Sequence, residues 1–176
     1  NAMGLYGDYT TLAVTLYRLP HAFIVPISSS LTPALSAAVS AQNKQRTKVT
    51  IFSSIKIASI ISIPCSIGMG VLAGPIISLL FGRNTPSETI ERTAPLLSIL
   101  SVAIFLMAML TITSSILQSY NKQNKPVISM TCGTIVKLIL NLVLISSFGI
   151  IGAPIATICG YFVMALINFI YLLKYT

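Results

Sequence analysis

The stretch that decides the fold is LILNLVLISSFGIIGAPIATICGYFVMALINFIYLL at residues 138–173, which contains no Asp, Glu, Lys or Arg. A helix needs roughly 20 apolar residues to cross about 30 Å of hydrocarbon. Residues 138–173 exceed that length, and FGIIGA at 148–153 divides them with glycines of the kind that end helices. Working outward, residues 19–43, 57–82 and 93–121 also lack charged side chains. The chain therefore consists largely of segments apolar enough to span a membrane.

The composition of the whole chain agrees with this interpretation. Of its 176 residues, 55% are hydrophobic and 8% are charged, whereas a soluble domain carries about 25% charged residues. The mean hydropathy is +0.89. These values exclude a soluble enzyme, a disordered chain, a coiled coil and collagen. Because open sheets cannot satisfy their edges in lipid, the expected fold class is an all-α membrane protein.

Clusters of charge and turn residues divide the chain into five expected transmembrane helices. The dividing segments are QNKQRTK at 42–48, GRNTPSETIER at 82–92, NKQNK at 121–125 and FGIIGA at 148–153. The expected helices, which together make a single transmembrane domain over residues 1–176, cover 9–41, 49–81, 93–120, 126–147 and 154–173. Five prolines are expected to kink the first two of them: Pro20, Pro26, Pro33, Pro64 and Pro75.

Charge is distributed unevenly between the two sides that these helices define. One side carries seven cations and no acid: Lys44, Arg46, Lys48, Lys56, Lys122, Lys125 and Lys174. The other side carries Asp8, Arg83, Glu88, Glu91 and Arg92. Basic loops usually face the cytoplasm, so the net charge of +8 indicates sidedness rather than a nucleic-acid partner. The N-terminus would then lie outside, and we expect the chain to be a fragment of a longer protein with at least one earlier helix.

Two cations, Arg18 and Lys137, fall well inside expected helices, near the bilayer midplane. A cation there costs about 2.5–3.5 kcal/mol on insertion scales, and no expected helix contains an acid that could neutralise it. Thr134 and Asn141 lie at i−3 and i+4 from Lys137 and share its helical face. Two interpretations remain open: the cations pair with backbone carbonyls or a missing helix, or they line a cavity that receives an anionic ligand. The second is our preferred hypothesis.

The sequence contains no arrangement typical of an active site or a metal site. Its three acids lie at the start or in loops, it has one His, and no Gly-rich phosphate loop follows a strand. The cysteines Cys65, Cys132 and Cys159 lack CxxC spacing and are expected to be small buried side chains. Because metal-dependent lipid-phosphate transferases need clustered carboxylates, we expect no enzymatic activity, no metal ion and no cofactor.

Several phrases of the chain resemble the multidrug/oligosaccharidyl-lipid/polysaccharide exporter superfamily, and most of all its stage V sporulation protein B and polysaccharide-biosynthesis branch. The most distinctive phrase is ILQSYNKQNKPVISMTCGTIVKLILNLVLI at 116–145. Others are LYGDYTTLAVTLYRLPHAFIVPISSSLTPALSAA at 5–38, AGPIISLLFG at 73–82, APLLSIL at 94–100 and FGIIGAPIATICGY at 148–161. The resemblance covers essentially the whole chain.

This resemblance implies a MATE-like transporter with two helical lobes around a central cavity, of which the chain would form most of one lobe. The missing N-terminal lobe of the same protein would be its partner. The implied function is a flippase that moves cell-wall, spore-cortex or polysaccharide precursors, linked to a polyprenyl diphosphate, across the bacterial cytoplasmic membrane by alternating access. The candidate substrate-binding residues are Lys137, Asn141, Arg18 and Thr134.

Two other classes of protein remain as alternatives. A multidrug cation antiporter of the same superfamily would need membrane-buried carboxylates, and the expected helices have none. A non-transporting membrane scaffold subunit has no need of midplane cations. The flippase is therefore the first hypothesis.

Overall fold

The computed structural model describes residues 7, 9–82 and 86–175, and these residues form helices and short turns without a β-strand. Asp8 and Arg83, which were counted in the charge distribution, lie outside the described residues. The elements in chain order are a π-helical turn η1 (Tyr9–Ala13), α2 (Val14–Arg18), α3 (His21–Ser40), α4 (Lys44–Val71), α5 (Ala73–Phe81), α6 (Ser87–Leu100), α7 (Val102–Ser119), α8 (Asn124–Phe148), a 3-10 turn η2 (Gly149–Ile151) and α9 (Gly152–Tyr175).

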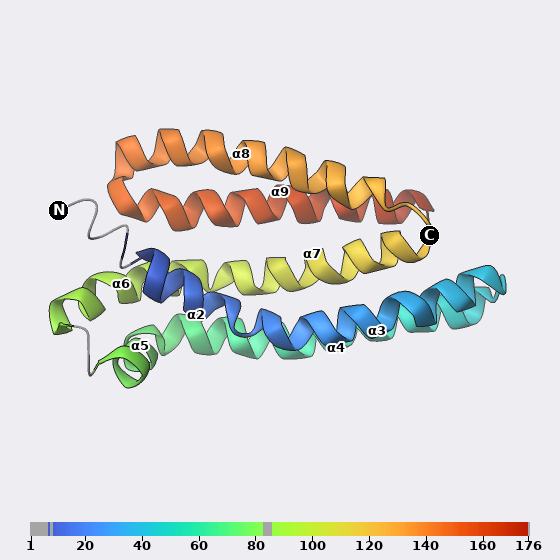
Figure 1. Ribbon diagram of the computed structural model, residues 1–176, viewed down its shortest axis with the longest axis horizontal. Helices are drawn as coiled ribbons and strands as arrows, with labels where there is room; N and C mark the ends of the chain where they lie inside the picture. The colour runs from blue at the N-terminus through green and yellow to red at the C-terminus, as the bar shows by residue number, and fades with distance from the viewer. Residues whose placement is uncertain (1–6, 8, 83–85, 176) are drawn as a thin grey trace.

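Four stretches of the described chain are long and apolar enough to cross a membrane: Thr11–Ser40, Lys44–Val71, Ser87–Ser119 and Asn124–Tyr175. The last has 52 residues, and it contains both α8 and α9. These two helices fold back on each other at η2, where Gly149 has a φ of +63°, a left-handed conformation that glycine adopts without strain. The chain is thus an all-α, multi-pass membrane protein (Figure 1).

The first span is interrupted at one proline and not at the others. Helix α2 ends at Arg18, and Pro20 precedes α3 as its N-cap, because proline has no N–H to continue the ladder. Pro26 and Pro33 lie inside α3, which is one continuous helix. Pro64 lies inside the unbroken α4 in the same way.

The second and third expected helices are each divided in two, at adjacent places. Helices α4 and α5 separate at Leu72, and α6 and α7 separate at Ser101. The Ser98 hydroxyl donates to the Gly70 carbonyl over 2.8 Å, and the Ser66 hydroxyl donates to the Ser101 carbonyl over 2.8 Å. Side-chain hydroxyls therefore compensate carbonyls at the two breaks, which lets neighbouring spans bend together.

The basic segment 44–48, expected to be a loop, instead forms the first turns of α4. The side chain of Asn43 accepts a hydrogen bond of 2.9 Å from the Arg46 N–H and caps the helix. This cap lets the helix begin outside the apolar stretch. The cysteines also depart from expectation, because Cys132 is exposed on α8, while Cys65 and Cys159 are half-buried. A face of α8 that points away from the bundle explains the exposed thiol.

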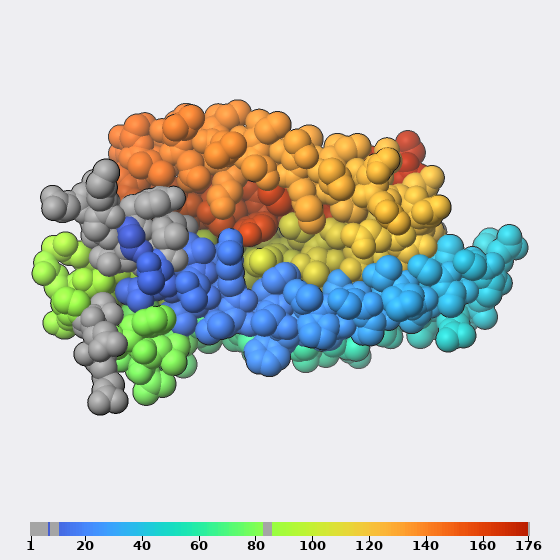
Figure 2. All heavy atoms as spheres, in the orientation of Figure 1, coloured from blue at the N-terminus to red at the C-terminus, as the bar shows by residue number. Residues whose placement is uncertain are grey.

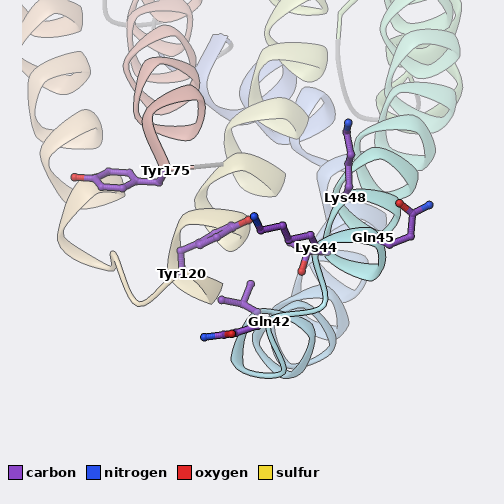
Figure 3. Close-up of a pocket in the computed structure, with 8 residues that line it drawn as sticks. Gln42, Lys44, Gln45, Lys48, Tyr120 and Tyr175 are labelled. Atoms are coloured by element: carbon purple, nitrogen blue, oxygen red, sulfur yellow. The ribbon is translucent and has the colours of Figure 1, made fainter.

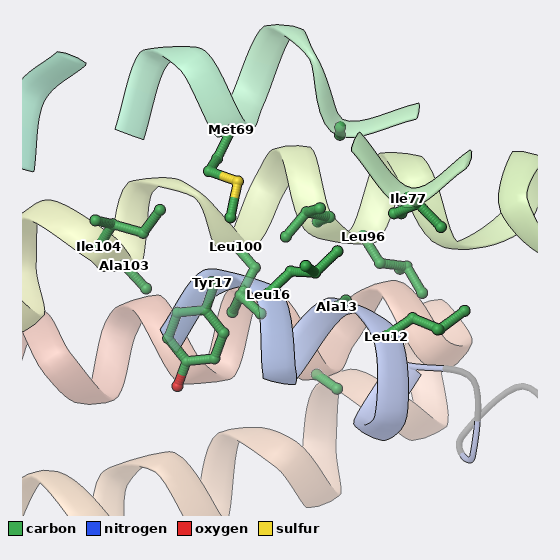
Figure 4. Close-up of a cluster of buried hydrophobic side chains, with 13 residues drawn as sticks. Leu12, Ala13, Leu16, Tyr17, Met69, Ile77, Leu96, Leu100, Ala103 and Ile104 are labelled. Atoms are coloured by element: carbon green, nitrogen blue, oxygen red, sulfur yellow. The ribbon is translucent and has the colours of Figure 1, made fainter. Parts of the chain in front are cut away.

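Two apolar clusters hold the bundle together. The first joins η1, α2, α4, α5, α6, α7 and the start of α9 toward the end where the chain begins, and its members include Leu12, Leu16, Tyr17, Met69, Ile77, Leu96, Leu100 and Ile104 (Figure 4). The second joins α3, α4 and α7 farther along, with Ile24, Leu31, Leu35, Ile51, Ile112 and Ile116 among its members. Helix α7 contributes to both clusters and is the most buried span, whereas the outer surfaces of α4, α8 and α9 expose large apolar side chains, as lipid-facing helices do.

The helices run along one common axis, so the turns gather at two ends (Figure 1). The α3–α4 turn, the α7–α8 turn and the end of α9 lie at one end, which we call the basic end because Lys44, Arg46, Lys48, Lys122, Lys125 and Lys174 lie there. The start of α6, with Glu88 and Glu91, lies at the opposite end together with η2. The segregation of charge read from the sequence is therefore present in the fold.

Candidate functional site

Lys137 lies where α8 and α9 pack closely against each other. A Cβ added to Gly160 of α9 would lie 2.8 Å from the Lys137 Cβ and 3.2 Å from the Gly133 carbonyl oxygen. A Cβ added to Gly133 would lie 2.8 Å from the Gly160 carbonyl oxygen and would also overlap Met164. Glycines at both positions let the two backbones meet, a common device in membrane helix pairs. The stem of Lys137 is consequently held against the backbone of α9.

The three candidate residues on α8 differ in exposure. Thr134 is exposed, whereas Lys137 and Asn141 are half-buried. The side-chain Oδ1 of Asn141 is buried and has no hydrogen-bond partner among the described residues. A buried acceptor without a donor is costly, so Asn141 offers an unused hydrogen-bonding position one turn from the Lys137 ammonium.

Arg18 is exposed at the end of α2 and directly follows Tyr17, a residue that contacts α9. Its Cζ lies 6.0 Å from the centroid of the Tyr17 ring, at the outer range of a cation–π contact. The Tyr17 hydroxyl lies 3.3 Å from the Tyr161 hydroxyl, which forms a hydrogen bond between α2 and α9. Tyr161 directly follows Gly160, against which Lys137 packs. Tyr17, the residue before Arg18, and Lys137 therefore contact consecutive residues of α9, Tyr161 and Gly160.

No carboxylate of the described residues approaches either cation. Within residues 9–82 and 86–175, the ion pair that the structure contains joins Glu88 and Arg92 on the exposed surface of α6. The same part of the chain has no cluster of three or more His, Cys, Asp or Glu side chains that could hold a metal ion. Arg18 and Lys137 therefore offer positive charge and hydrogen-bond donors.

A polar groove lies beside this site, between α3, α7 and α8. Figure 2 shows α7 recessed between α3 and α8 along this face of the molecule. The groove has a volume of about 270 Å³ and is lined by Ser28, Ser29, Thr32, Thr111, Ser114, Ser115, Gln118 and Met130. Met130 lies one turn before Thr134 on α8, so the groove continues the face that carries the candidate residues. The hydroxyl-rich sequence at residues 28–32 is the feature from which this groove could have been predicted.

Asn168 is a buried polar residue that links neighbouring helices through hydrogen bonds. It is fully buried on α9, donates to the Ser114 hydroxyl over 2.8 Å, and accepts from the Ser129 hydroxyl over 2.6 Å. A longer contact of 3.4 Å reaches the Thr113 hydroxyl. These bonds tie α7, α8 and α9 together and fix the position of the α8–α9 pair that carries Lys137.

Comparison with known proteins identifies the class of protein. A family model described as "Lipid II flippase MurJ" matches residues 8–176. The chain is 28% identical over 155 residues to the lipid II flippase MurJ of Bacillus subtilis, an alignment that covers 88% of this chain and 28% of that protein. It is 27% identical over 166 residues to a probable low-salt glycan biosynthesis flippase of Haloferax volcanii, covering 94% of this chain and 34% of that protein.

A solved structure has the same fold. An inward-facing multidrug-resistance MATE family transporter of the MOP superfamily superimposes with a TM-score of 0.77 and 20% identity, covering 97% of this chain and 40% of that chain. These findings confirm the predicted fold class and the resemblance to the exporter superfamily. The chain spans about a third or less of the length of the two flippases named above.

Proposed function

The chain belongs to the lipid II flippase MurJ family, and from that premise we propose that the complete protein moves lipid-linked cell-wall or polysaccharide precursors across the bacterial cytoplasmic membrane. The substrate would be a sugar carried on a polyprenyl diphosphate. The chain would form most of one lobe, and alternating access would need the N-terminal lobe of the same protein as its partner. The basic end would face the cytoplasm, because basic loops are retained there.

The observation that carries this proposal is Lys137, a cation packed between two membrane helices with no carboxylate paired to it, while Tyr17, the neighbour of Arg18, contacts the next residue of α9. A diphosphate supplies the missing negative charge. Lys137 would attract it as a point charge, and Arg18 would bind phosphate oxygens in a fork. Asn141 would donate its amide N–H to the substrate and use its unpartnered Oδ1 to accept from a sugar hydroxyl. Thr134, exposed on the same face, would contact the sugar that follows.

Multidrug cation antiport is the second candidate, because the structural neighbour of the same fold is a multidrug-resistance transporter. A cationic drug needs anionic groups in the membrane. This chain has acids only at positions 8, 88 and 91. Position 8 precedes the first of the four spans, and Glu88 and Glu91 lie in the exposed first turns of α6. The charge of the spans therefore favours an anionic substrate.

The test uses the complete protein, reconstituted in liposomes with a fluorescent polyprenyl-diphosphate disaccharide, and compares Lys137→Arg with Lys137→Gln. Arg keeps the charge, so it should retain part of the flipping rate. Gln removes a charge-assisted contact, so its rate should fall about tenfold or more. Lys56→Gln is the matched control, because Lys56 is an exposed lysine on α4, outside the α8–α9 pair.

Equal flipping by Lys137→Gln and the unchanged protein, at equal membrane levels, would exclude the role of Lys137. Proton-driven uptake of a cationic dye without any movement of the lipid-linked sugar would instead identify an antiporter.

A further inference from the structure

A second hollow lies at the basic end of the bundle (Figure 3) and shares no lining residue with the polar groove. Its volume of about 570 Å³ falls within the range of small-molecule sites. Four elements converge on it: the end of α3 and its turn, the first turns of α4, the residue that follows α7, and the end of α9. The lining residues are Val39, Gln42, Lys44, Gln45, Thr47, Lys48, Tyr120 and Tyr175.

The charge of this pocket is positive, and none of its lining residues is an acid. Lys44 and Lys48 lie one turn apart on the same face of α4 and both line the pocket. The sequence has no Asp or Glu from residue 9 to 87 or after residue 91. Glu88 and Glu91 lie on α6 at the opposite end of the bundle. Two neighbouring lysines repel each other, so the pocket gains most from an anion that comes from outside the chain.

Tyrosine rings form one wall of the pocket and hold further cations beside it. The Lys122 Nζ lies 5.3 Å from the centroid of the Tyr175 ring, and the Lys125 Nζ lies 5.0 Å from that of Tyr171. Tyrosine is enriched where membrane helices pass through the headgroup layer, since its ring is apolar and its hydroxyl is polar. The pocket lies where the spans end, which is the depth of lipid headgroups.

We propose that this pocket binds the phosphate of an anionic glycerophospholipid headgroup. Lys44 and Lys48 would hold the phosphate as two point charges, with the Thr47 and Tyr120 hydroxyls as additional donors. Gln42 and Gln45 offer amide groups for headgroup hydroxyls. The lipid tails would follow the apolar outer surface of α4, where Val49 and Phe52 are exposed. The site does not depend on the transported substrate, so it goes beyond the function proposed above.

The experiment titrates the complete, delipidated protein in detergent with phosphatidylglycerol and follows binding by native mass spectrometry. Phosphatidylcholine, whose phosphate is neutralised by its own ammonium group, is the comparison lipid. The test variant is Lys44→Gln/Lys48→Gln, and both lysines are exposed, so no core contact is lost. The control is Arg46→Gln/Lys174→Gln, which removes the same charge from the same end at positions that do not line the pocket.

We expect the test variant to bind phosphatidylglycerol about tenfold more weakly, the control to change less than about twofold, and phosphatidylcholine to bind weakly to all three proteins. An equal loss in both double variants would show diffuse attraction and overturn the site. A third arm adds soluble glycerol phosphate. If it binds as tightly as phosphatidylglycerol, with the same dependence on Lys44 and Lys48, the site is one for free phosphate and the lipid assignment is wrong.

Discussion

Substituting Gly160→Ala tests the helix crossing that positions Lys137. The added Cβ would lie 2.8 Å from the Lys137 Cβ and 3.2 Å from the Gly133 carbonyl oxygen. Carbon atoms in contact prefer about 3.5–4.0 Å, so α8 and α9 must separate by roughly an ångström. The Lys137 Cβ is attached directly to its helix and cannot rotate away. The new methyl group therefore acts on the backbone pair itself.

The magnitude follows from two opposing effects. Overpacking of this kind costs about 1–3 kcal/mol, whereas replacing a glycine inside a helix by alanine returns about 1 kcal/mol through helix propensity. The net result for Gly160→Ala is a loss of about 0–2 kcal/mol. Gly68→Ala is the matched control, since Gly68 lies inside α4 and an added Cβ there meets nothing within 4 Å. Gly68→Ala should therefore gain about 1 kcal/mol of stability from helix propensity without any cost of overpacking.

The assay is reversible unfolding of the complete protein in mixed micelles, with the free energy of unfolding measured for both variants. We expect the two substitutions to differ by about 1–3 kcal/mol, with Gly160→Ala the less stable. The flipping rate should also fall in Gly160→Ala and not in Gly68→Ala, since only the first displaces the stem of Lys137. If Gly160→Ala is as stable as Gly68→Ala, the close approach of α8 and α9 is not what the structure indicates.

Two further predictions concern packing and topology. Asn168→Leu roughly keeps the side-chain volume but removes the two short hydrogen bonds with Ser114 and Ser129. The free energy of unfolding should therefore drop by about 1–3 kcal/mol, and Ser129→Ala should lower it by less. An unchanged free energy of unfolding in Asn168→Leu would argue against the buried network. The topology is tested in a protein that lacks Cys65, Cys132 and Cys159. Cysteines placed at Arg46 and Gln123 should react with a membrane-impermeant maleimide only from the cytoplasmic side, and a cysteine at Glu91 only from outside. Labelling of position 46 from outside would reverse the topology.

Much of the fold could be predicted from the sequence, because a membrane span is specified by its own composition. The charge-free stretches around residues 19–43 and 138–173 predict helices without reference to any partner. The separation of cations from acids follows from the same local pattern, and the structure gathers them at opposite ends. The subdivision of the spans was not predictable in this way. The breaks at Leu72 and Ser101 are accompanied by hydroxyl bonds that link α4 to α6 and to Ser101, which no single segment specifies.

The candidate site shows the same division between local and tertiary information. The sequence by itself marked Arg18 and Lys137 as cations in apolar surroundings and placed Thr134 and Asn141 on the face of Lys137. Only the tertiary structure decided that Lys137 and Tyr17, the neighbour of Arg18, contact consecutive residues of α9, since this depends on the Tyr17–Tyr161 contact and on the two glycines at the helix crossing. The physical reason is range: burial in lipid is set by each residue's own neighbours along the chain, whereas the meeting of distant side chains is set by how the helices pack.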